Sequence, residues 1–236
     1  MPDNDNALAW EKYWRELPAG DGEALWDVDP RHGVLHHLPW FAEHFDPELP
    51  VADVGCGSGR QTEALAEHFR RVYGFEVSEA ALAAARRAHP ASNVDYRVLD
   101  LCDPAAVAAC HAELGDLNLY VRTVLHQLPV EQRPAAAGNL TALLGERGLA
   151  FVVELAPGAA DVFASWPREQ RSKLDDLHEA GLVPARLEDG ELERLLTAAG
   201  LEIVQSAEFR GHSTETGSDG AVLEVPMRRV LVRPAS

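Results

Sequence analysis

From residue 51 onward, short apolar runs alternate with longer segments in which apolar residues recur every three or four positions. The short runs are typical of buried strands, and the longer segments are typical of helices. Strands that alternate with helices predict a parallel, doubly wound α/β sheet with right-handed crossovers. The expected strands are 50–54, 71–76, 94–99, 117–121 and 148–155, and the expected helices are 61–69, 78–88, 104–113 and 134–144.

Residues 157–189 interrupt this alternation, because they contain Pro157, Pro167 and Pro184 and a charged helix at about 168–180. We interpret this segment as an insertion rather than as a domain of its own. The last expected elements are a helix at 192–199, strands at 201–209 and 226–232, and a loop rich in Gly, Ser and Thr at 211–220.

The first 50 residues have a different pattern and hold four of the five tryptophans. Apolar residues at helical spacing predict a helix at 10–17, which Pro18 and the following glycines end. A second helix is expected at about 33–45. We therefore divide the chain into an N-terminal helical cap (1–48) and a main domain (49–236).

The composition favours one α/β domain with a small cap, since the chain has 236 residues and 46% of them are hydrophobic. The formal net charge of −17 predicts repulsion from phosphates and anionic lipids, and so no nucleic-acid or membrane partner.

Three cysteines without CxxC spacing predict neither a disulfide framework nor a structural zinc site. The acidic N-terminus does not resemble a signal peptide, and no apolar run is long enough to cross a bilayer. We therefore expect a cytoplasmic protein.

The pattern Asp53-x-Gly55-x-Gly57-x-Gly59 stands where a strand turns into a helix. Glycines let a ligand approach the main chain, and the helix start offers free N–H groups. A ligand-free glycine turn is one interpretation. A dinucleotide site is disfavoured, because Gly-x-Gly-x-x-Gly would need a third glycine where Arg60 or Thr62 stands. A third interpretation, an S-adenosylmethionine site, is the one that a family resemblance implies.

The stretch VADVGCGSGRQTEALA (51–66) resembles motif I of the class I S-adenosylmethionine-dependent methyltransferases, and the resemblance extends over residues 50–155. It implies a mostly parallel seven-stranded sheet of order 3-2-1-4-5-7-6 with the last strand antiparallel. It also implies S-adenosyl-L-methionine as cofactor, S-adenosyl-L-homocysteine as product and a small organic acceptor.

In this family an acidic residue after the second strand binds the ribose hydroxyls, and Glu76 matches that place, 23 residues after Asp53. An Asp after the third strand accepts the adenine amino group, and Asp100 with the backbone of Leu101 fits. The alternatives are an exposed charge for Glu76 and a helix N-cap for Asp100, although Asp103 would cap that helix equally well. The implied cofactor-binding residues are Tyr13, Asp53, Gly55, Cys56, Gly57, Gly59, Glu76, Val77, Asp100, Leu101 and Arg122.

Two residues near the end of the fourth strand are the catalytic candidates. Arg122 departs from the family pattern, in which this position is often small or polar, and its side chain could pair with a carboxylate of the cofactor or of an acidic substrate. His126 has a side chain suited to a general base, with a structural histidine as the alternative.

In similar small-molecule methyltransferases, N-terminal helices cover the cofactor and line the acceptor pocket. By this resemblance Tyr13 and Trp14 are placed near the cofactor, and the implied substrate-binding residues are Trp14, His36, His37 and Trp40. His32 and His36 are one helical turn apart, but no motif supplies a matching carboxylate, so we predict no metal.

Sequence alone leaves the acceptor and the attacking atom (O, N or C) open. The usage of Ala, Arg and Glu is compatible with secondary metabolism. A non-methylating reaction, such as cyclisation of the aminobutyrate arm with release of methylthioadenosine, and a non-catalytic cofactor-binding subunit both remain as alternatives. The oligomeric state, including a homodimer, also stays open.

Overall fold

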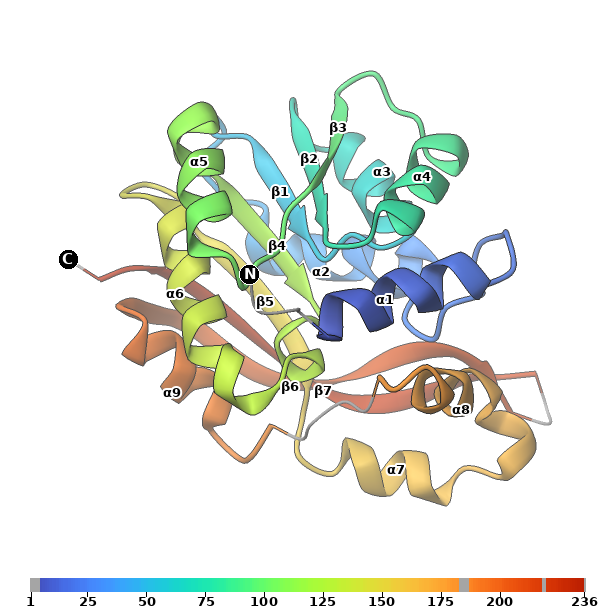
Figure 1. Cartoon of the computed structure of the whole chain (residues 1–236). Helices are drawn as coiled ribbons and strands as arrows, with labels where there is room; N and C mark the ends of the chain where they lie inside the picture. Colours follow the sequence, from blue (N-terminus) through green and yellow to red (C-terminus); the bar gives the residue numbers. More distant parts are fainter. Residues whose placement is uncertain (1–4, 183–186, 218–219, 236) are drawn as a thin grey trace.

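The computed structural model describes residues 5–182, 187–217 and 220–235, and within them seven strands form one sheet of order β3-β2-β1-β4-β5-β7-β6 (Figure 1). The first five strands are parallel, and β7 runs antiparallel to both β5 and β6. The predicted order and the antiparallel last strand are confirmed. The strands are β1 Val51–Val54, β2 Val72–Glu76, β3 Val94–Val98, β4 Asn118–Arg122, β5 Ala150–Leu155, β6 Leu201–Thr216 and β7 Val222–Pro234.

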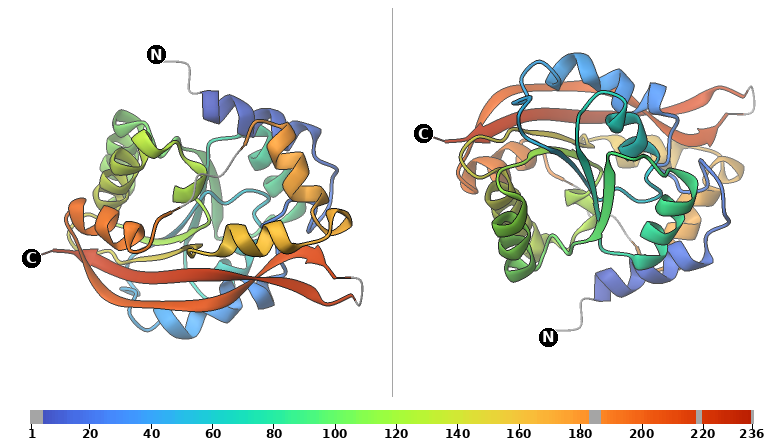
Figure 2. Two further views of the ribbon diagram at one scale, coloured as in Figure 1. Left: turned by 90° about the horizontal axis from the view of Figure 1, so that it is seen from below. Right: turned by 90° about the horizontal axis from the view of Figure 1, so that it is seen from above.

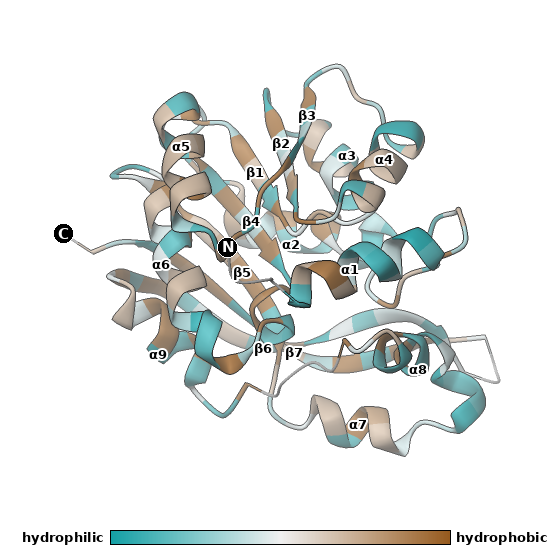
Figure 3. Ribbon diagram, in the orientation of Figure 1, coloured by the Kyte–Doolittle hydropathy of each residue, from teal (hydrophilic) through white to brown (hydrophobic). Residues whose placement is uncertain are grey.

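Helices cover both faces of the sheet (Figure 2). One face packs against α5, α6 and α9, and the other packs against α2 and α3. The apolar residues are concentrated along the central strands (Figure 3). The helices are α1 Asp5–Glu16, α2 Val34–Phe41, α3 Arg60–Ala66, α4 Glu79–Ala88, α5 Pro104–Leu114, α6 Arg133–Leu144, α7 Ala159–Ser165, α8 Ser172–Glu179 and α9 Glu191–Ala198.

The central strand β1 shows why this sequence forms a buried parallel sheet. All four of its residues are buried. Ala52 and Val54 belong to the core beneath α5 and α6, whereas Val51 belongs to the core beneath α2 and α3. A strand that is covered on both faces needs an apolar residue at nearly every position, which leaves Asp53 as an exception that requires a function.

The two helices of the N-terminal segment lie at different places on the sheet. Helix α1 lies in front of the carboxyl ends of the strands, whereas α2 packs on a face of the sheet. Phe41 of α2 is fully buried, and its ring lies at a tilt against those of Tyr120 and Phe151. Helix α2 ends at Phe41, so it is shorter than the predicted helix at 33–45.

The insertion contains one helix that the sequence did not predict, α7. The predicted charged helix divides into a short turn at Arg168–Gln170 and α8. Phe163 of α7 and Leu174 and Leu177 of α8 join the core that also contains α2 and α3. The prediction for Pro184 lies outside the described residues.

The predicted loop at 211–220 is wrong over its first six residues, because β6 continues to Thr216 and pairs with β7 from Val222. Gly211, Ser213 and Glu215 are buried and alternate with less buried residues. This is the period of a strand, but it is carried by polar and small residues that a search for apolar alternation misses.

None of the helices in the described part of the chain combines the length and apolar character that crossing a bilayer requires.

Candidate active site

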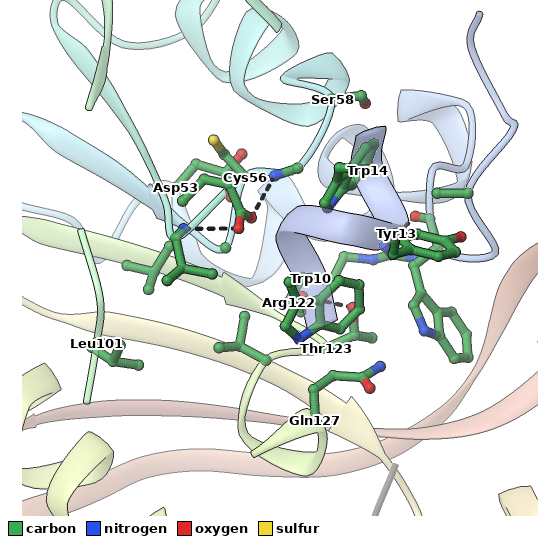
Figure 4. Close-up of a pocket in the computed structure, with 18 of the residues that line it drawn as sticks. Trp10, Tyr13, Trp14, Asp53, Cys56, Ser58, Leu101, Arg122, Thr123 and Gln127 are labelled. Atoms are coloured by element: carbon green, nitrogen blue, oxygen red, sulfur yellow. Dashed lines mark hydrogen bonds between the residues drawn. The ribbon is translucent and has the colours of Figure 1, made fainter. Parts of the chain in front are cut away.

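One cavity, which we name the first cavity, lies beyond the carboxyl ends of β1, β2 and β4 (Figure 4). Open α/β sheets bind their ligands at this edge. The cavity has a volume of about 1160 Å³, including its open mouth. Ten of the eleven residues predicted to bind a cofactor line it: Tyr13, Asp53, Gly55, Cys56, Gly57, Glu76, Val77, Asp100, Leu101 and Arg122.

The glycine loop presents its main chain to this cavity. Gly55 has φ +73° and Gly57 has φ +52°, which are backbone conformations that other residues rarely adopt. A Cβ at Gly55 would lie 2.6 Å from Cγ2 of Val124, and a Cβ at Gly57 would lie 2.9 Å from the ring of Trp14. Side chains at these two positions would therefore displace the walls of the cavity.

Gly59 does not line the cavity, which corrects its predicted position. It is the left-handed residue that precedes α3, and a Cβ there would lie 2.5 Å from the hydroxyl of Tyr96 and 2.8 Å from Cβ of Ala85. Only glycine therefore fits at this position, where the start of α3 packs against α4 and β3.

Asp53 is the buried acid at the end of β1. Its side chain is 3% exposed, and its Oδ2 accepts a hydrogen bond from the hydroxyl of Thr62 at 2.7 Å. Burial raises the pKa of Asp53 to about 7, despite this hydrogen bond and the charge of Arg122. A positively charged ligand beside Asp53 would therefore stabilise its ionised carboxylate.

Glu76 ends β2, and backbone amides hold its carboxylate in place. Oε1 accepts from Val77 N at 2.8 Å and Ser78 N at 3.1 Å, and Oε2 accepts from Gly57 N at 3.2 Å. Burial nevertheless raises its pKa. The alternative of an exposed charge is wrong, because Glu76 is 8% exposed. Three of the four lone pairs of this carboxylate are thus occupied, and Oε2 keeps one that can accept from a ligand hydroxyl.

Asp100 follows β3, and its Oδ1 accepts from Cys102 N at 2.8 Å. It is not the cap of the next helix. Asp103 caps α5 by accepting from the backbone amides of Ala105 and Ala106. Asp100 faces the first cavity together with Leu101.

Arg122 supplies positive charge to the first cavity. It is 8% exposed, and its Nη1 donates to the carbonyl of Trp26 at 2.8 Å. Its Nε and Nη2 are buried without a partner. Burial lowers the pKa of this guanidinium. A buried donor without a partner costs free energy, and an anion that accepted from Nε and Nη2 would recover it.

The chain turns sharply after Arg122, at Thr123. This residue has φ +57°, and among the residues that the structure describes it is the one non-glycine residue with a positive φ. Its N–H donates to Val153 O, and its hydroxyl donates to Arg122 O, both at 2.7 Å. A β-branched residue in this conformation is strained, and such strain is concentrated at functional sites. No local pattern in the sequence indicates it.

Helix α1 covers the first cavity with Trp10, Tyr13 and Trp14. The ring of Tyr13 makes edge-to-face contacts with both tryptophans. On the same helix, Oε2 of Glu11 accepts from Ser78 Oγ at 2.7 Å and from Ala80 N at 3.0 Å. These two bonds fasten α1 to the N-terminus of α4.

Three residues that were predicted to bind substrate lie away from the first cavity, because α2 covers a face of the sheet instead. His37 is buried, and its Nδ1 is 2.8 Å from the hydroxyl of Tyr120. His36 lies over Phe209, and the ring of Trp40 is 3.2 Å below the guanidinium carbon of Arg229. Trp14 is the member of that predicted set that lines the cavity.

His126 also does not line the first cavity. It is 1% exposed, its Nδ1 bonds to the carboxylate of Glu154, and its Nε2 is 3.0 Å from the amide of Gln127. His126 instead lines a second cavity of about 840 Å³, including its mouth, between β5, α7 and α8. Trp26 lines both cavities.

Sequence reasoning missed Trp26 and Asp27, which belong to an irregular segment between α1 and α2. Asp27 accepts from Gly22 N at 2.7 Å and from Ser58 Oγ at 2.9 Å, and it lines the first cavity. Residues 24–28 have no helical or strand period, so only the tertiary fold brings them to the glycine loop. Within the described ranges, no group of three His, Cys, Asp or Glu side chains is arranged to hold a metal ion.

Similarities to known proteins show the family of this chain. A family model described as a methyltransferase domain matches residues 51–148. A solved S-adenosylmethionine-dependent methyltransferase from Anabaena variabilis ATCC 29413 is 34% identical over 99% of this chain and 96% of that protein, with a TM-score of 0.89. This chain belongs to the S-adenosylmethionine-dependent methyltransferases.

Two further relatives are more distant from this methyltransferase. The ubiquinone biosynthesis O-methyltransferase of Azoarcus sp. (strain BH72) is 27% identical over 82% of this chain and 78% of that protein. The N-methyltransferase NodS from Bradyrhizobium japonicum WM9, solved with S-adenosyl-L-homocysteine, is 18% identical over 99% of this chain and all of that protein, with a TM-score of 0.62. The second likeness concerns the fold alone.

S-adenosylmethionine is the cofactor of this methyltransferase, and the donors and acceptors of the first cavity fit it. The unpartnered nitrogens of Arg122 suit its carboxylate, and the buried acid Asp53 suits its ammonium. The bare main chain at Gly55 and Gly57 admits a ligand at close range.

Proposed function

We propose that this methyltransferase acts on a small organic acceptor. The observation that carries this proposal is the cover of α1 over the first cavity, with Trp10, Tyr13 and Trp14 turned toward it. A covered cavity admits a small molecule more readily than a folded macromolecule. The net charge of −17 also disfavours polyanionic acceptors.

For the cofactor we propose four polar contacts. Oε2 of Glu76 accepts a hydrogen bond from a ribose hydroxyl, and Asp100 accepts one from the adenine amino group beside the backbone of Leu101. Arg122 pairs with the carboxylate, and Asp53 faces the ammonium. When bound, S-adenosylmethionine supplies an electrophilic methyl group on its sulfonium. The chain's contribution is to orient the reactants and to exclude water.

We assign the removal of the acceptor proton to His126. Its Nδ1–H donates to Glu154, and its Nε2 accepts from the amide of Gln127. The O–H or N–H of the acceptor takes the place of that amide as the donor to Nε2. The acceptor atom gains the methyl group and loses its proton to His126, and S-adenosyl-L-homocysteine leaves. The named activity of the Azoarcus relative supports an oxygen nucleophile.

Mass analysis of products tests this function. Purified protein is incubated with S-adenosylmethionine and a panel of phenols, carboxylic acids and amines. We expect S-adenosyl-L-homocysteine and a product about 14 mass units heavier than one acceptor, because methyl transfer with loss of a proton adds one CH₂. Release of methylthioadenosine without S-adenosyl-L-homocysteine would contradict the proposal, since that product marks displacement of the aminobutyrate arm.

A further inference from the structure

The second cavity has a lining unlike that of the first. Most of its wall is apolar and comes from β5, α7 and α8, with the rings of Trp26 and Phe163 among the side chains. Its polar side chains are basic or titratable as bases: His126, Arg171 and His178. Among the described residues that line it, none is Asp or Glu.

Two buried donors in this wall have no partner. Nε of Arg171 and Nε1 of Trp26 are both shielded from solvent without a hydrogen bond. A buried donor without a partner costs free energy that an acceptor group on a ligand would recover. An anion satisfies a guanidinium better than a neutral acceptor does, because the hydrogen bond is then assisted by charge.

Trp26 connects this cavity to the cofactor site. Its ring packs edge-to-face on His126 and on Phe163, with centroids 6.1 Å and 5.9 Å apart. Its carbonyl accepts from Arg122 of the first cavity. The next residues after His126 turn the other way, since Gln127 and Leu128 line the first cavity. The two cavities therefore adjoin at Trp26.

We propose that the second cavity is the acceptor site, and that it binds an apolar, ring-containing molecule that carries one anionic group. The ring packs against Trp26 and Phe163, and the anion pairs with Arg171. This inference rests on the proposed function only in naming the bound molecule as the methyl acceptor. It runs against the acidic surface, whose field is screened over about 8–10 Å in physiological salt, so the local basic groups set the preference.

Three naphthalene probes with the same ring and different charge test the proposal: 1-naphthoate, 1-naphthylmethanol and 1-naphthylmethylamine. Each is titrated calorimetrically into protein saturated with S-adenosyl-L-homocysteine. We expect 1-naphthoate to bind about tenfold or more tighter than the alcohol, on the scale of hydrogen bonds to charged groups, and the amine to bind weakest. Equal or tighter binding of the amine, or no binding of any probe, would overturn the proposal.

Variants locate the probe. Arg171→Gln should remove the preference for 1-naphthoate over the alcohol, whereas Arg168→Gln, a matched change at an exposed residue of the preceding turn, should retain it. Ala160→Phe should weaken all three probes by filling the cavity. Retention of the preference in Arg171→Gln, or unchanged binding in Ala160→Phe, would refute the site.

The affinity for S-adenosyl-L-homocysteine is measured in every variant and should not change, because neither Arg171 nor Ala160 lines the first cavity. This readout also separates the two proposals. Probe binding without methylated product from any acceptor would defeat the proposed function and leave the second cavity as a binding site. Methylated product with no charge preference among probes would defeat the inference alone.

Discussion

The two cavities that share Trp26 have opposite chemistry. The first contains the carboxylates of Asp27, Asp53, Glu76 and Asp100 around the guanidinium of Arg122. The second contains no carboxylate among its described lining residues, and its charged or titratable groups are basic. An acidic site that suits a cationic nucleoside thus adjoins, at Trp26, an apolar site that suits an anion.

The net charge of a protein therefore does not predict the ligand preference of each of its sites. The charge of −17 describes the field far from the surface, and salt screens it within about one nanometre. Inside a buried site, the few groups that line the wall decide which ligand is stabilised. Variants in one cavity should therefore leave ligand binding in the other unchanged.

The largest expected effect comes from the glycine loop. Gly55→Ala should weaken binding of S-adenosyl-L-homocysteine by about 100-fold, since overpacking costs roughly 1–3 kcal/mol and the new Cβ would lie 2.6 Å from Val124 Cγ2. Gly200→Ala is the matched control, because Gly200 also has positive φ (+85°) but a Cβ there would meet no atom within 4 Å. Calorimetry should show unchanged affinity in the control, and equal affinities in both variants would contradict this account.

Arg122 gives the next largest effect. Arg122→Met should weaken binding of S-adenosyl-L-homocysteine by about 30-fold, within the roughly 1.5–3 kcal/mol of a charged hydrogen bond. Binding of methylthioadenosine, which has no carboxylate, should change little. A parallel loss of affinity for both ligands would show that Arg122 acts through the shape of the cavity rather than through the carboxylate.

Asp53 predicts a dependence of cofactor binding on pH. Its pKa of about 7 means that it is largely protonated at pH 6 and largely ionised at pH 8. An ammonium prefers the ionised form, so the affinity for S-adenosyl-L-homocysteine should rise about tenfold over this window. Asp53→Asn should flatten the profile measured by calorimetry. A wild-type profile that is already flat would contradict the role of Asp53.

The same raised pKa affects the stability of the ligand-free protein. Asp53 binds its proton more tightly when folded than when unfolded, so its contribution favours folding at low pH. That contribution is lost as the pH rises from about 4 to about 7. Between these two pH values, the free energy of unfolding measured with denaturant should decline less in Asp53→Asn than in the wild type.

The smallest expected effect is at the cover of the first cavity. Glu11→Gln should speed dissociation of S-adenosyl-L-homocysteine by about threefold, because a partly exposed charged contact contributes roughly 0.5–1 kcal/mol. Glu16→Gln changes the same charge on the exposed side of α1 and should leave the dissociation rate unchanged in stopped-flow measurements. Equal rates in both variants would show that the bonds of Glu11 to α4 do not hold the cover.

The first cavity could be predicted from sequence because its residues follow a local rule. Asp53, Glu76 and Asp100 each stand at or just after the end of a parallel strand, and the carboxyl ends of neighbouring parallel strands meet at one edge. The glycines between them are visible as a spaced motif. The sheet order was implied by family resemblance rather than by periodicity.

Other parts could not be predicted, because tertiary packing decides them. The helical period of residues 34–41 shows an apolar face, but it does not show which surface that face covers, so His36, His37 and Trp40 were expected at the wrong place. Trp26 has no regular neighbours to reveal its position. The strand at Gly211 to Thr216 alternates burial among polar residues, which conceals its period.

A crystal structure with S-adenosyl-L-homocysteine and 1-naphthoate tests the central claim most directly. We expect the nucleoside in the first cavity, with a ribose hydroxyl at Glu76 and its carboxylate within hydrogen-bond distance of Arg122. The naphthoate should lie in the second cavity, with its carboxylate at Arg171. A carboxylate of the cofactor bound away from Arg122, or naphthoate bound outside the second cavity, would contradict the account.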